Sequence, residues 1–292
     1  MRRIVVMSGK GGTGKTTITA ALSHCAGTEA VIADCDVDAS NLHLLLRPDV
    51  GKEERFMGGW LPMFDSRSCT LCGMCADACA WSAIILRNGQ YEVDPGLCEG
   101  CGVCAHVCPD GYITMTPRVT GMLFASRSRF RQSMYHARLG IGQENSGKLV
   151  AKVASEAMAA AERERKEFLL IDGPPGIGCP AIAALTAATE VLIVTEATHS
   201  ALHDLCRLIE LIAQLSLPAA CIINKADLDR ETANDIHRLC AERCIPVLAA
   251  FPWSEDFPES LRQGRTLLEL CNPQWQERIG TIWNHISTGV LT

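Results

Sequence analysis

Residues 9–17, GKGGTGKTT, constrain the fold more strongly than any other part of the chain. They directly follow a short β-branched run at residues 4–7 and lead into a segment of helical character from Gly14 onward. Successive backbone N–H groups in such a loop, together with the helix N-terminus, form a binding site for phosphate. The order of strand, loop and helix therefore predicts an α/β nucleoside triphosphatase and argues against a chance loop sequence.

Short apolar runs alternate with helical segments through much of the remaining chain. The predicted buried strands cover residues 30–33, 168–171, 191–194, 221–223 and 247–250, with helices at 148–166, 199–215 and 273–285. This alternation predicts a mostly parallel sheet covered by helices on both faces. Residues 47–61 lose the periodicity, and we expect a loop or a weak hairpin there.

Eight cysteines interrupt the α/β pattern. They form two copies of C-x2-C-x2-C-x3-C, namely Cys69, Cys72, Cys75 and Cys79, then Cys98, Cys101, Cys104 and Cys108. The copies belong to an internal repeat, in which CTLCGMCADACAWSAII aligns with CEGCGVCAHVCPDGYIT. This is the bacterial ferredoxin pattern for two [4Fe–4S] clusters. A zinc ribbon is the alternative, although zinc needs only four ligands and does not need the repeated spacing.

The pattern also predicts which cysteines share a cluster, because the fourth cysteine of each run serves the other cluster. The first cluster is expected to use Cys69, Cys72, Cys75 and Cys108, and the second Cys98, Cys101, Cys104 and Cys79. Pro109 follows the last cysteine as the pattern requires, whereas Ala80 stands after the first run. We divide the chain into an ATPase domain at 1–61, an inserted ferredoxin domain at 62–117 and the rest of the ATPase at 118–292.

Composition narrows the possible partners and the cellular setting. A net charge of −6 and a pI near 5.8 argue against a nucleic-acid-binding protein. No apolar run approaches the roughly 20 residues of a membrane span. The apolar run at residues 4–7 is too short for an export signal. Sixteen cysteines without such a signal indicate metal binding rather than disulfides, and a cytoplasmic location.

Lys10 makes the loop read KGGTGKT, which resembles the deviant phosphate loop of the MinD/ParA family. That family includes the Mrp-type cluster carriers and the nitrogenase iron protein. The resemblance implies that Lys10 crosses a dimer interface to reach the nucleotide of the partner. It therefore implies ATP with Mg2+, held in a nucleotide-dependent homodimer or in a heterodimer with a similar ATPase.

The same resemblance assigns the remaining nucleotide site. ADCDVDASNL, from residue 33, is similar to the first switch, where Asp36 positions the attacking water and Asp34 lies beside Mg2+. LLIDGPPGIGCP, from residue 169, supplies the Walker-B Asp172, and the amide of Gly176 faces the γ-phosphate. We expect Lys15 to reach the phosphates and Thr16 to bind Mg2+. The predicted cofactor-binding residues are Gly9, Lys10, Gly11, Gly12, Thr13, Gly14, Lys15, Thr16, Thr17, Gly176, Asn224, Pro252 and Trp253.

Two features leave alternatives open. Asn224 and Asp227 belong to NKAD, which is similar to the guanine-selective NKxD motif, whereas in MinD-like proteins the matching asparagine recognises adenine. ATP is the prediction and GTP the alternative. Cys179 stands seven residues after Asp172, where the nitrogenase iron protein has a cluster-bridging cysteine. Its role as a ninth functional thiol is a hypothesis.

These patterns predict a slow, partner-stimulated ATPase with catalytic groups Lys10, Lys15, Asp36 and Asp172. The cysteine module is inserted between the two switches, so nucleotide state is expected to gate two [4Fe–4S] clusters for electron transfer to a redox partner. An ATP-dependent carrier that passes clusters to an acceptor protein is the alternative. A MinD/ParA-type positioning ATPase is the third hypothesis.

Overall fold

Nine strands form one sheet in the computed structural model, which describes residues 1–140 and 146–289. The strand order is β11-β10-β9-β1-β8-β2-β7-β6-β3, and a separate pair, β4-β5, lies elsewhere. The strands are β1 Arg2–Ser8, β2 Ala30–Asp34, β3 Asp49–Phe64, β4 Ile84–Arg87, β5 Gln90–Val93, β6 Ile113–Arg127, β7 Ser133–Leu139, β8 Phe168–Pro175, β9 Glu190–Glu196, β10 Ala219–Asn224 and β11 Val247–Ala250. All neighbours from β11 to β7 pair in parallel, so the mostly parallel sheet is confirmed.

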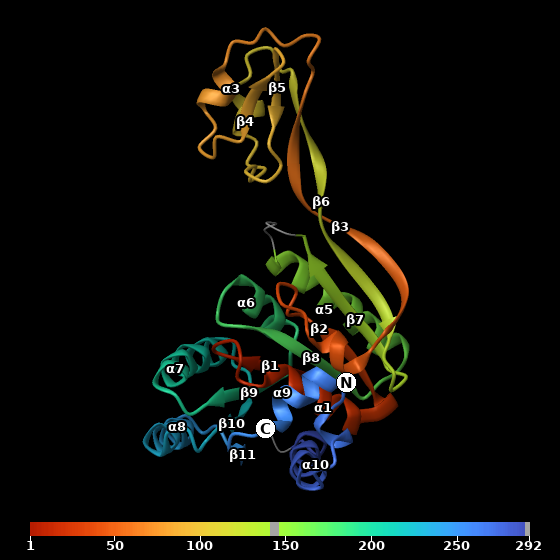
Figure 1. The fold of residues 1–292 in the computed structure, drawn as a ribbon, viewed down its shortest axis with the longest axis vertical. Helices are drawn as coiled ribbons and strands as arrows, with labels where there is room; N and C mark the ends of the chain where they lie inside the picture. Colours follow the sequence, from red (N-terminus) through yellow and green to blue (C-terminus); the bar gives the residue numbers. More distant parts are fainter. Residues whose placement is uncertain (141–145, 290–292) are drawn as a thin grey trace.

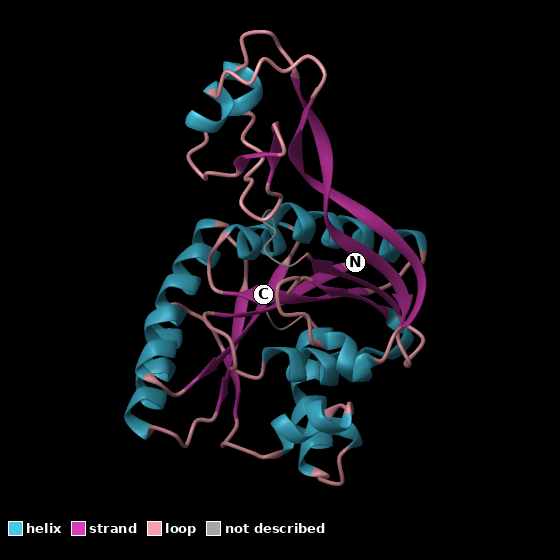
Figure 2. Ribbon diagram, turned by 45° about the horizontal axis from the view of Figure 1, so that its top comes forward, coloured by secondary structure: helices cyan, strands magenta, loops and turns pink. Residues whose placement is uncertain are grey.

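Helices cover both faces of this sheet, as predicted (Figures 1 and 2). One apolar core lies under α5, α6, α7 and α8, and the other lies under α1, α2, α9 and α10. The helices are α1 Lys15–Ala26, α2 Leu42–Leu46, α3 Met74–Asp77, α4 Val103–Val107, α5 Ser146–Arg163, α6 Cys179–Thr186, α7 His199–Gln214, α8 Arg230–Glu242, α9 Asp256–Gln263 and α10 Gln274–Ser287, with 3-10 turns η1 Gly27–Glu29 and η2 Leu267–Glu269. None of the described helices is long and apolar enough to cross a membrane.

Parallel pairing brings the carboxyl ends of the central strands to one edge of the sheet. Val6 of β1 lies opposite Asp172 of β8, and Asp172 lies opposite Asp34 of β2. The loops that follow these strands therefore meet at one place. In open α/β sheets this edge is where ligands bind.

The prediction of a loop or weak hairpin at residues 47–61 is wrong. From Asp49 onward this segment belongs to β3, which pairs with β6 in an antiparallel ribbon with three shifts of register. The residues from Asp49 to Arg55 are all exposed, so no buried face imposes an alternating pattern on the sequence. Residues 118–139 contain the end of β6 and all of β7, and these two strands lie between β3 and the parallel part of the sheet.

The ribbon carries a small module away from the α/β body (Figure 1). Residues 65–112 of this module contain α3, β4, β5 and α4. Its apolar core is small, with Cys75, Ile84 and Ile113 as the buried members. Small natural domains with such a core usually gain further stability from disulfides, a structural metal, oligomerisation or very close helix packing. None of the cysteines within these residues forms a disulfide.

The tail helix α10 packs into the body, as its apolar face predicts. Trp275, Ile279, Ile282 and Ile286 are all at most 1% exposed. Trp275 meets the rings of Phe251 and Phe257 edge-on. This helix therefore belongs to the core under α1.

Candidate nucleotide site and cysteine cavities

The loop between β1 and α1 has the backbone that its glycines predict. Gly12 and Gly14 have φ angles of +82° and +94°, in the left-handed region that side chains disfavour. A Cβ on Gly14 would lie 2.6 Å from Nδ2 of Asn224 and 2.8 Å from the ring of Phe257. Glycine is therefore required here both for conformation and for the close packing of the loop.

Four polar groups converge where this loop enters α1. Lys15 Nζ lies 2.9 Å from Asp172 Oδ1, and the hydroxyl groups of Thr16 and Thr19 donate to the same carboxylate at 2.8 and 2.9 Å. Burial alone would lower the pKa of Lys15, but the carboxylates of Asp172 and Asp36 outweigh burial and raise it. Lys15 thus carries a fixed positive charge at the helix N-terminus.

Asp34 and Asp36 approach this group from the end of β2. Asp34 is fully buried and accepts hydrogen bonds from the hydroxyl group of Ser40 at 2.6 Å and from the amide of Asp36 at 3.1 Å. Burial, reinforced by the nearby charge of Asp172, raises the pKa of Asp34 to about 7. Asp36 Oδ2 lies 3.7 Å from Lys15 Nζ, and burial raises the pKa of Asp36 as well.

A cavity of about 1080 Å3, including space open to solvent, lies over the loop and α1. Its lining includes predicted residues from the loop, together with Asp36, Asn224 and Trp253. The lining residues are Ser8, Gly11, Gly12, Thr13, Gly14, Lys15, Thr16, Thr17, Asp36, Ala39, Asn41, Pro175, Asn224, Lys225, Trp253, Phe257, Pro258 and Leu261. Gly9, Lys10, Gly176 and Pro252 are not among them, and the amide of Gly176 donates to the carbonyl of Ser8 at 2.9 Å.

In the single chain, the side chain of Lys10 contacts residues at the end of β9 and the start of α7. Its Nζ is 2.7 Å from Glu196 Oε1 and donates to Thr198 and Ser200 at 3.2 and 3.0 Å. Lys225 binds the other oxygen of Glu196 at 2.7 Å and also donates to the carbonyl of Gly12. Burial would raise the pKa of Glu196, but hydrogen bonds from the two lysines lower it. Glu196 therefore remains ionised and holds both lysines beside the loop.

The side chain of Asn224 is used within the protein. It is 1% exposed, donates to the carbonyl of Thr13 at 2.8 Å and accepts from the amide of Lys225 at 3.0 Å. Asp227 Oδ1 accepts from the backbone N–H of Trp253 at 2.5 Å. The indole of Trp253 is 52% exposed at the rim of the cavity. Asn224 thus supports the phosphate loop, while Asp227 holds the segment that presents Trp253.

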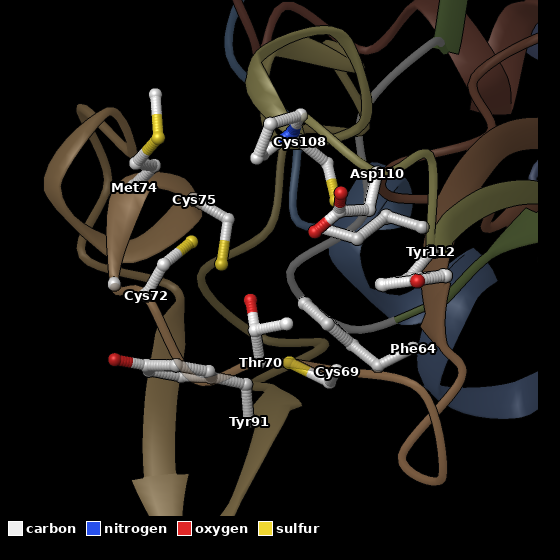
Figure 3. A pocket seen from close by; sticks show the side chains of 13 residues that line it. Phe64, Cys69, Thr70, Cys72, Met74, Cys75, Tyr91, Cys108, Asp110 and Tyr112 are labelled. Carbon is white, nitrogen blue, oxygen red and sulfur yellow. The ribbon is translucent and has the colours of Figure 1, made fainter.

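The eight cysteines of the repeat line two separate cavities of the module. The first, of about 390 Å3 including space open to solvent, is lined by Cys69, Cys72, Cys75 and Cys108, whose side chains surround one space in Figure 3. The second, of about 350 Å3 including space open to solvent, is lined by Cys98, Cys101, Cys104 and Cys79. Cys108 and Cys79 have therefore exchanged places relative to the order of the sequence. Each cavity gathers four thiols, the donor set of a [4Fe–4S] cluster.

The rest of each cavity is mostly apolar. Phe64, Met74, Tyr91 and Ile113 line the first, and Trp81, Ile84, Val103 and Met115 line the second. Backbone N–H groups approach two of the sulfurs: that of Ala83 donates to Cys79 and that of Gly100 to Cys98, each at 3.4 Å. Although four cysteines line each cavity, no group of three or more His, Cys, Asp or Glu side chains among the described residues is arranged so that it could hold a metal ion, and the two predicted clusters remain a proposal.

Cys179 lies outside both cavities, exposed at the first residue of α6. Its Cβ is 3.2 Å from the position that a Cβ on Gly147 would take. It therefore marks the contact between α6 and the start of α5. Within the described residues, it forms no disulfide.

Sequence reasoning missed Glu196, Lys225, Ser40 and Phe257. Glu196 ends β9 after a run of apolar residues, and a carboxylate at the carboxyl end of a buried strand was a usable signal. Ser40 falls inside the first switch and could have been identified as a partner for Asp34. Phe257 carried no local signal, because α9 reaches the loop only through the tertiary fold.

Known proteins are similar to this chain over most of its length. A family model described as the CobQ/CobB/MinD/ParA nucleotide binding domain matches residues 4–267. An uncharacterized protein of Methanocaldococcus jannaschii is 31% identical over 230 residues, which are 78% of this chain and 79% of the relative. A proposed septum site-determining protein MinD of Tupiella akineta is 26% identical over 274 residues, covering 91% of this chain and 71% of the relative.

Solved structures agree with the family model on the fold. The cell division ATPase MinD of Pyrococcus furiosus has a TM-score of 0.58 at 20% identity, with 98% of both chains covered. MinD of Pyrococcus horikoshii, complexed with Mg-ADP, has a TM-score of 0.57 at 20% identity, covering 100% of this chain and 98% of that one. The names of these two solved structures refer to cell division, to septum-site determination and to Mg-ADP, and neither refers to iron–sulfur clusters. By the extent of the family match, this chain belongs to the CobQ/CobB/MinD/ParA family of nucleotide-binding proteins.

Proposed function

We propose that this chain is an ATP-hydrolysing iron–sulfur protein in which nucleotide state gates two [4Fe–4S] clusters for electron transfer to a partner. The observation that carries the proposal is the pair of thiol cavities, each combining three cysteines of one run with the fourth of the other. The proposed module spans residues 62–117, and its boundaries lie within the ribbon of β3 and β6. When bound, the clusters would supply one-electron redox chemistry.

The nucleotide half of the proposal rests on groups already in place at the sheet edge. The loop amides and Lys15 would bind and neutralise the phosphates of ATP. Thr16 and Asp34 would hold Mg2+, which would supply charge neutralisation at the phosphates. Asp36 would orient water, and Asp172 would keep Lys15 and Thr16 in position. Family membership and the Mg-ADP complex of the Pyrococcus horikoshii relative support ATP over GTP.

Lys10 is the residue through which we propose dimer formation. Its side chain is 28% exposed, so it remains accessible although Glu196 holds it in the single chain. A partner nucleotide would compete with Glu196 for this charge. A homodimer is the simpler arrangement, and a heterodimer with a similar ATPase would use the same contact.

Backbone hydrogen bonds connect the first switch to the ribbon. The carbonyl of Val37 accepts from the amide of Leu139 at 3.3 Å, and the next amide, of Gly140, donates to the carbonyl of Thr120 at 2.8 Å. Val37 is adjacent to Asp36, and Thr120 lies in β6. A nucleotide-dependent movement of the switch would therefore reach the strands that carry the cysteine module.

Anaerobic reconstitution with iron and sulfide, followed by EPR-monitored redox titration, tests the proposal. We expect two clusters per chain, loss of one in Cys101→Ser, and no loss in the control Cys244→Ser, whose cysteine is exposed outside both cavities. A wild-type protein that binds no iron and sulfide refutes cluster binding. Potentials, partner affinity and oligomeric state that stay the same without nucleotide, with ATP and with ADP refute gating.

Transfer of the clusters to an apo-acceptor distinguishes the carrier alternative from electron transfer. Clusters that survive chelator and pass to no acceptor support electron transfer. ATP-dependent loss from this chain, with matching gain by the acceptor, supports a carrier instead.

A positioning ATPase is the second candidate, because the Tupiella akineta relative is similar over 91% of this chain. Such a protein would bind membrane or DNA in its ATP state. Co-sedimentation with anionic liposomes or with DNA, compared between ATP and ADP, distinguishes this candidate from the redox proposal.

A further inference from the structure

The loop that lines the second thiol cavity contacts both strands of the ribbon, at positions that lie side by side in β3 and β6. Gly100, between Cys98 and Cys101, has a φ of +68°, and a Cβ there would lie 2.6 Å from the carbonyl oxygen of Trp60 in β3. From β6, the guanidinium group of Arg118 donates to the carbonyl of Cys98 at 3.3 Å. The two contact positions are neighbours across the ribbon, because Trp60 of β3 pairs with Pro117 of β6 and Gly59 pairs with Arg118.

Arg118 makes the two cavities electrostatically different. Each cavity has one carboxylate in its lining, Asp110 in the first and Glu99 in the second, and neither lining contains a lysine or arginine. Within residues 65–112, all of which are described, the lysines and arginines are Arg67 and Arg87, and both are exposed. The half-buried Arg118 therefore supplies a cationic contact to the ligand loop of the second cavity.

Arg118 also stands where the ribbon leaves the sheet of the body. The pairing of β6 with β7 ends at Gly121, and the register of β3 against β6 is irregular between Phe56 and Gly59. Thr120, in the same short stretch, is the residue whose carbonyl is bound by Gly140. Arg118 thus lies two residues from the hydrogen bonds that lead to the first switch.

We propose that Arg118 is a positioning residue that raises the reduction potential of the second cluster above that of the first and couples it to the ribbon. This inference rests on the proposed function, because it requires clusters in the two cavities. A cationic donor on the backbone of a ligand loop stabilises the state with the additional electron. The second cluster is therefore the one that is reduced first. A movement of the ribbon that displaces Arg118 changes the reduction potential of this cluster.

The test is an anaerobic redox titration of reconstituted wild-type protein and of Arg118→Gln, Arg118→Lys and Arg127→Gln, with dithionite as the reductant. Arg127 is an exposed arginine on the same strand, within the body of the protein, and serves as the control. In Arg118→Gln we expect one of the two potentials to fall, so that the reduced-to-oxidised ratio at a given solution potential drops about tenfold, or about 59 mV for one electron. Arg118→Lys keeps most of the wild-type potential, and Arg127→Gln changes neither potential.

Two additional backgrounds assign the shift to one cluster. The fall must persist in a Cys72→Ser background, which disables the first cavity, and must vanish in a Cys101→Ser background, which disables the second. The difference in the second potential between ATP and ADP must also shrink in Arg118→Gln.

The outcomes separate this inference from the proposed function. Arg118→Gln with full iron content and two unchanged potentials overturns the role of Arg118 and leaves the cluster proposal standing. A shift of equal size in Arg127→Gln, or a shift assigned to the first cluster, also overturns it. Absence of iron and sulfide from the wild type overturns both proposals.

Discussion

The ion pair between Arg129 and Glu269 connects the end of β6 to the C-terminal part of the chain. The substitution Glu269→Gln tests how much this pair contributes to the free energy of unfolding. Arg129 follows β6, binds both carboxylate oxygens of Glu269 and donates to the carbonyls of Leu45 and Leu46 at the end of α2. The carboxylate also accepts from the amide of Thr266 at 2.7 Å. Glutamine keeps an oxygen for Thr266, so the variant mainly removes the charge.

The magnitude follows from the pKa of Glu269. Burial would raise this pKa, but the hydrogen bonds from Arg129 and Thr266 outweigh burial and lower it from 4.5 to about 2. At about 1.36 kcal/mol per pH unit, this difference corresponds to about 3 kcal/mol. Because a hydrogen bond to Thr266 survives in the variant, we expect Glu269→Gln to lower the free energy of unfolding by about 2 to 3 kcal/mol at pH 7.

The sign of the pH dependence is also determined. A carboxylate with a lowered folded pKa stabilises the protein above its unfolded pKa, and this stabilisation is lost as pH falls through the folded value. The difference between wild type and Glu269→Gln should therefore be constant above about pH 4.5 and shrink between about pH 4.5 and pH 2.

Urea unfolding followed by circular dichroism, at pH 7 and at a series of values below pH 4.5, measures both effects. The control is Glu54→Gln, which removes an exposed ion pair with Lys52 on the ribbon. We expect no measurable change in the control, because exposed ion pairs contribute little. Equal losses in the two variants, or a loss for Glu269→Gln that does not depend on pH, would refute the reasoning.

Four further predictions follow from the site, the core, the ribbon and the exposed thiol. Lys15→Ala should abolish ATP binding, measured by titration calorimetry, yet leave the iron content of the reconstituted protein unchanged; loss of iron would contradict the separation of the two sites. Trp275→Ala should lower the free energy of unfolding by about 3 to 5 kcal/mol, because the side chain is 1% exposed. Gly58→Ala should weaken the ribbon by about 1 to 3 kcal/mol, since its Cβ would lie 2.2 Å from the hydroxyl oxygen of Thr120, and increased proteolysis of residues 49–64 measures this. Cys179→Ala should keep full cluster content and ATPase activity, because that thiol lies outside both cavities, and a loss of either would restore its functional role.

Much of the fold could be predicted from local patterns. The buried strands of the body are continuous apolar runs. The phosphate loop can be recognised by its glycines, two of which adopt a left-handed backbone conformation. The ribbon could not be predicted in this way. Its exposed half, Asp49–Arg55, has no buried face, and it pairs with the distant end of β6, where Asp49 lies opposite Arg127 and Arg55 opposite Met122.

In the candidate nucleotide site as well, the sequence identifies some residues, whereas their geometry depends on the tertiary structure. Lys15, Thr16, Asp36 and Asp172 were identifiable because each belongs to a motif at the end of a predicted strand. Their distances come from the tertiary packing of the strand ends, and the rise in the pKa of Asp34 to about 7 comes from its burial and from the nearby charge of Asp172. Burial at this edge depends on the pairing of β2 with β8, which no local pattern records.

The sequence by itself determined the chemistry of this protein: a phosphate loop with an early lysine, two switch aspartates, and eight cysteines in a repeated spacing. These features could be recognised because each depends on residues close together in the chain. Only the tertiary structure decided how the chemistry is arranged. It paired Lys10 with Glu196, formed two cavities around the cysteines that the repeat had already grouped, and placed the cysteine module at the end of a ribbon whose Arg118 donates to the carbonyl of Cys98. Those contacts join residues far apart in sequence, and packing and hydrogen bonding between distant strands select them.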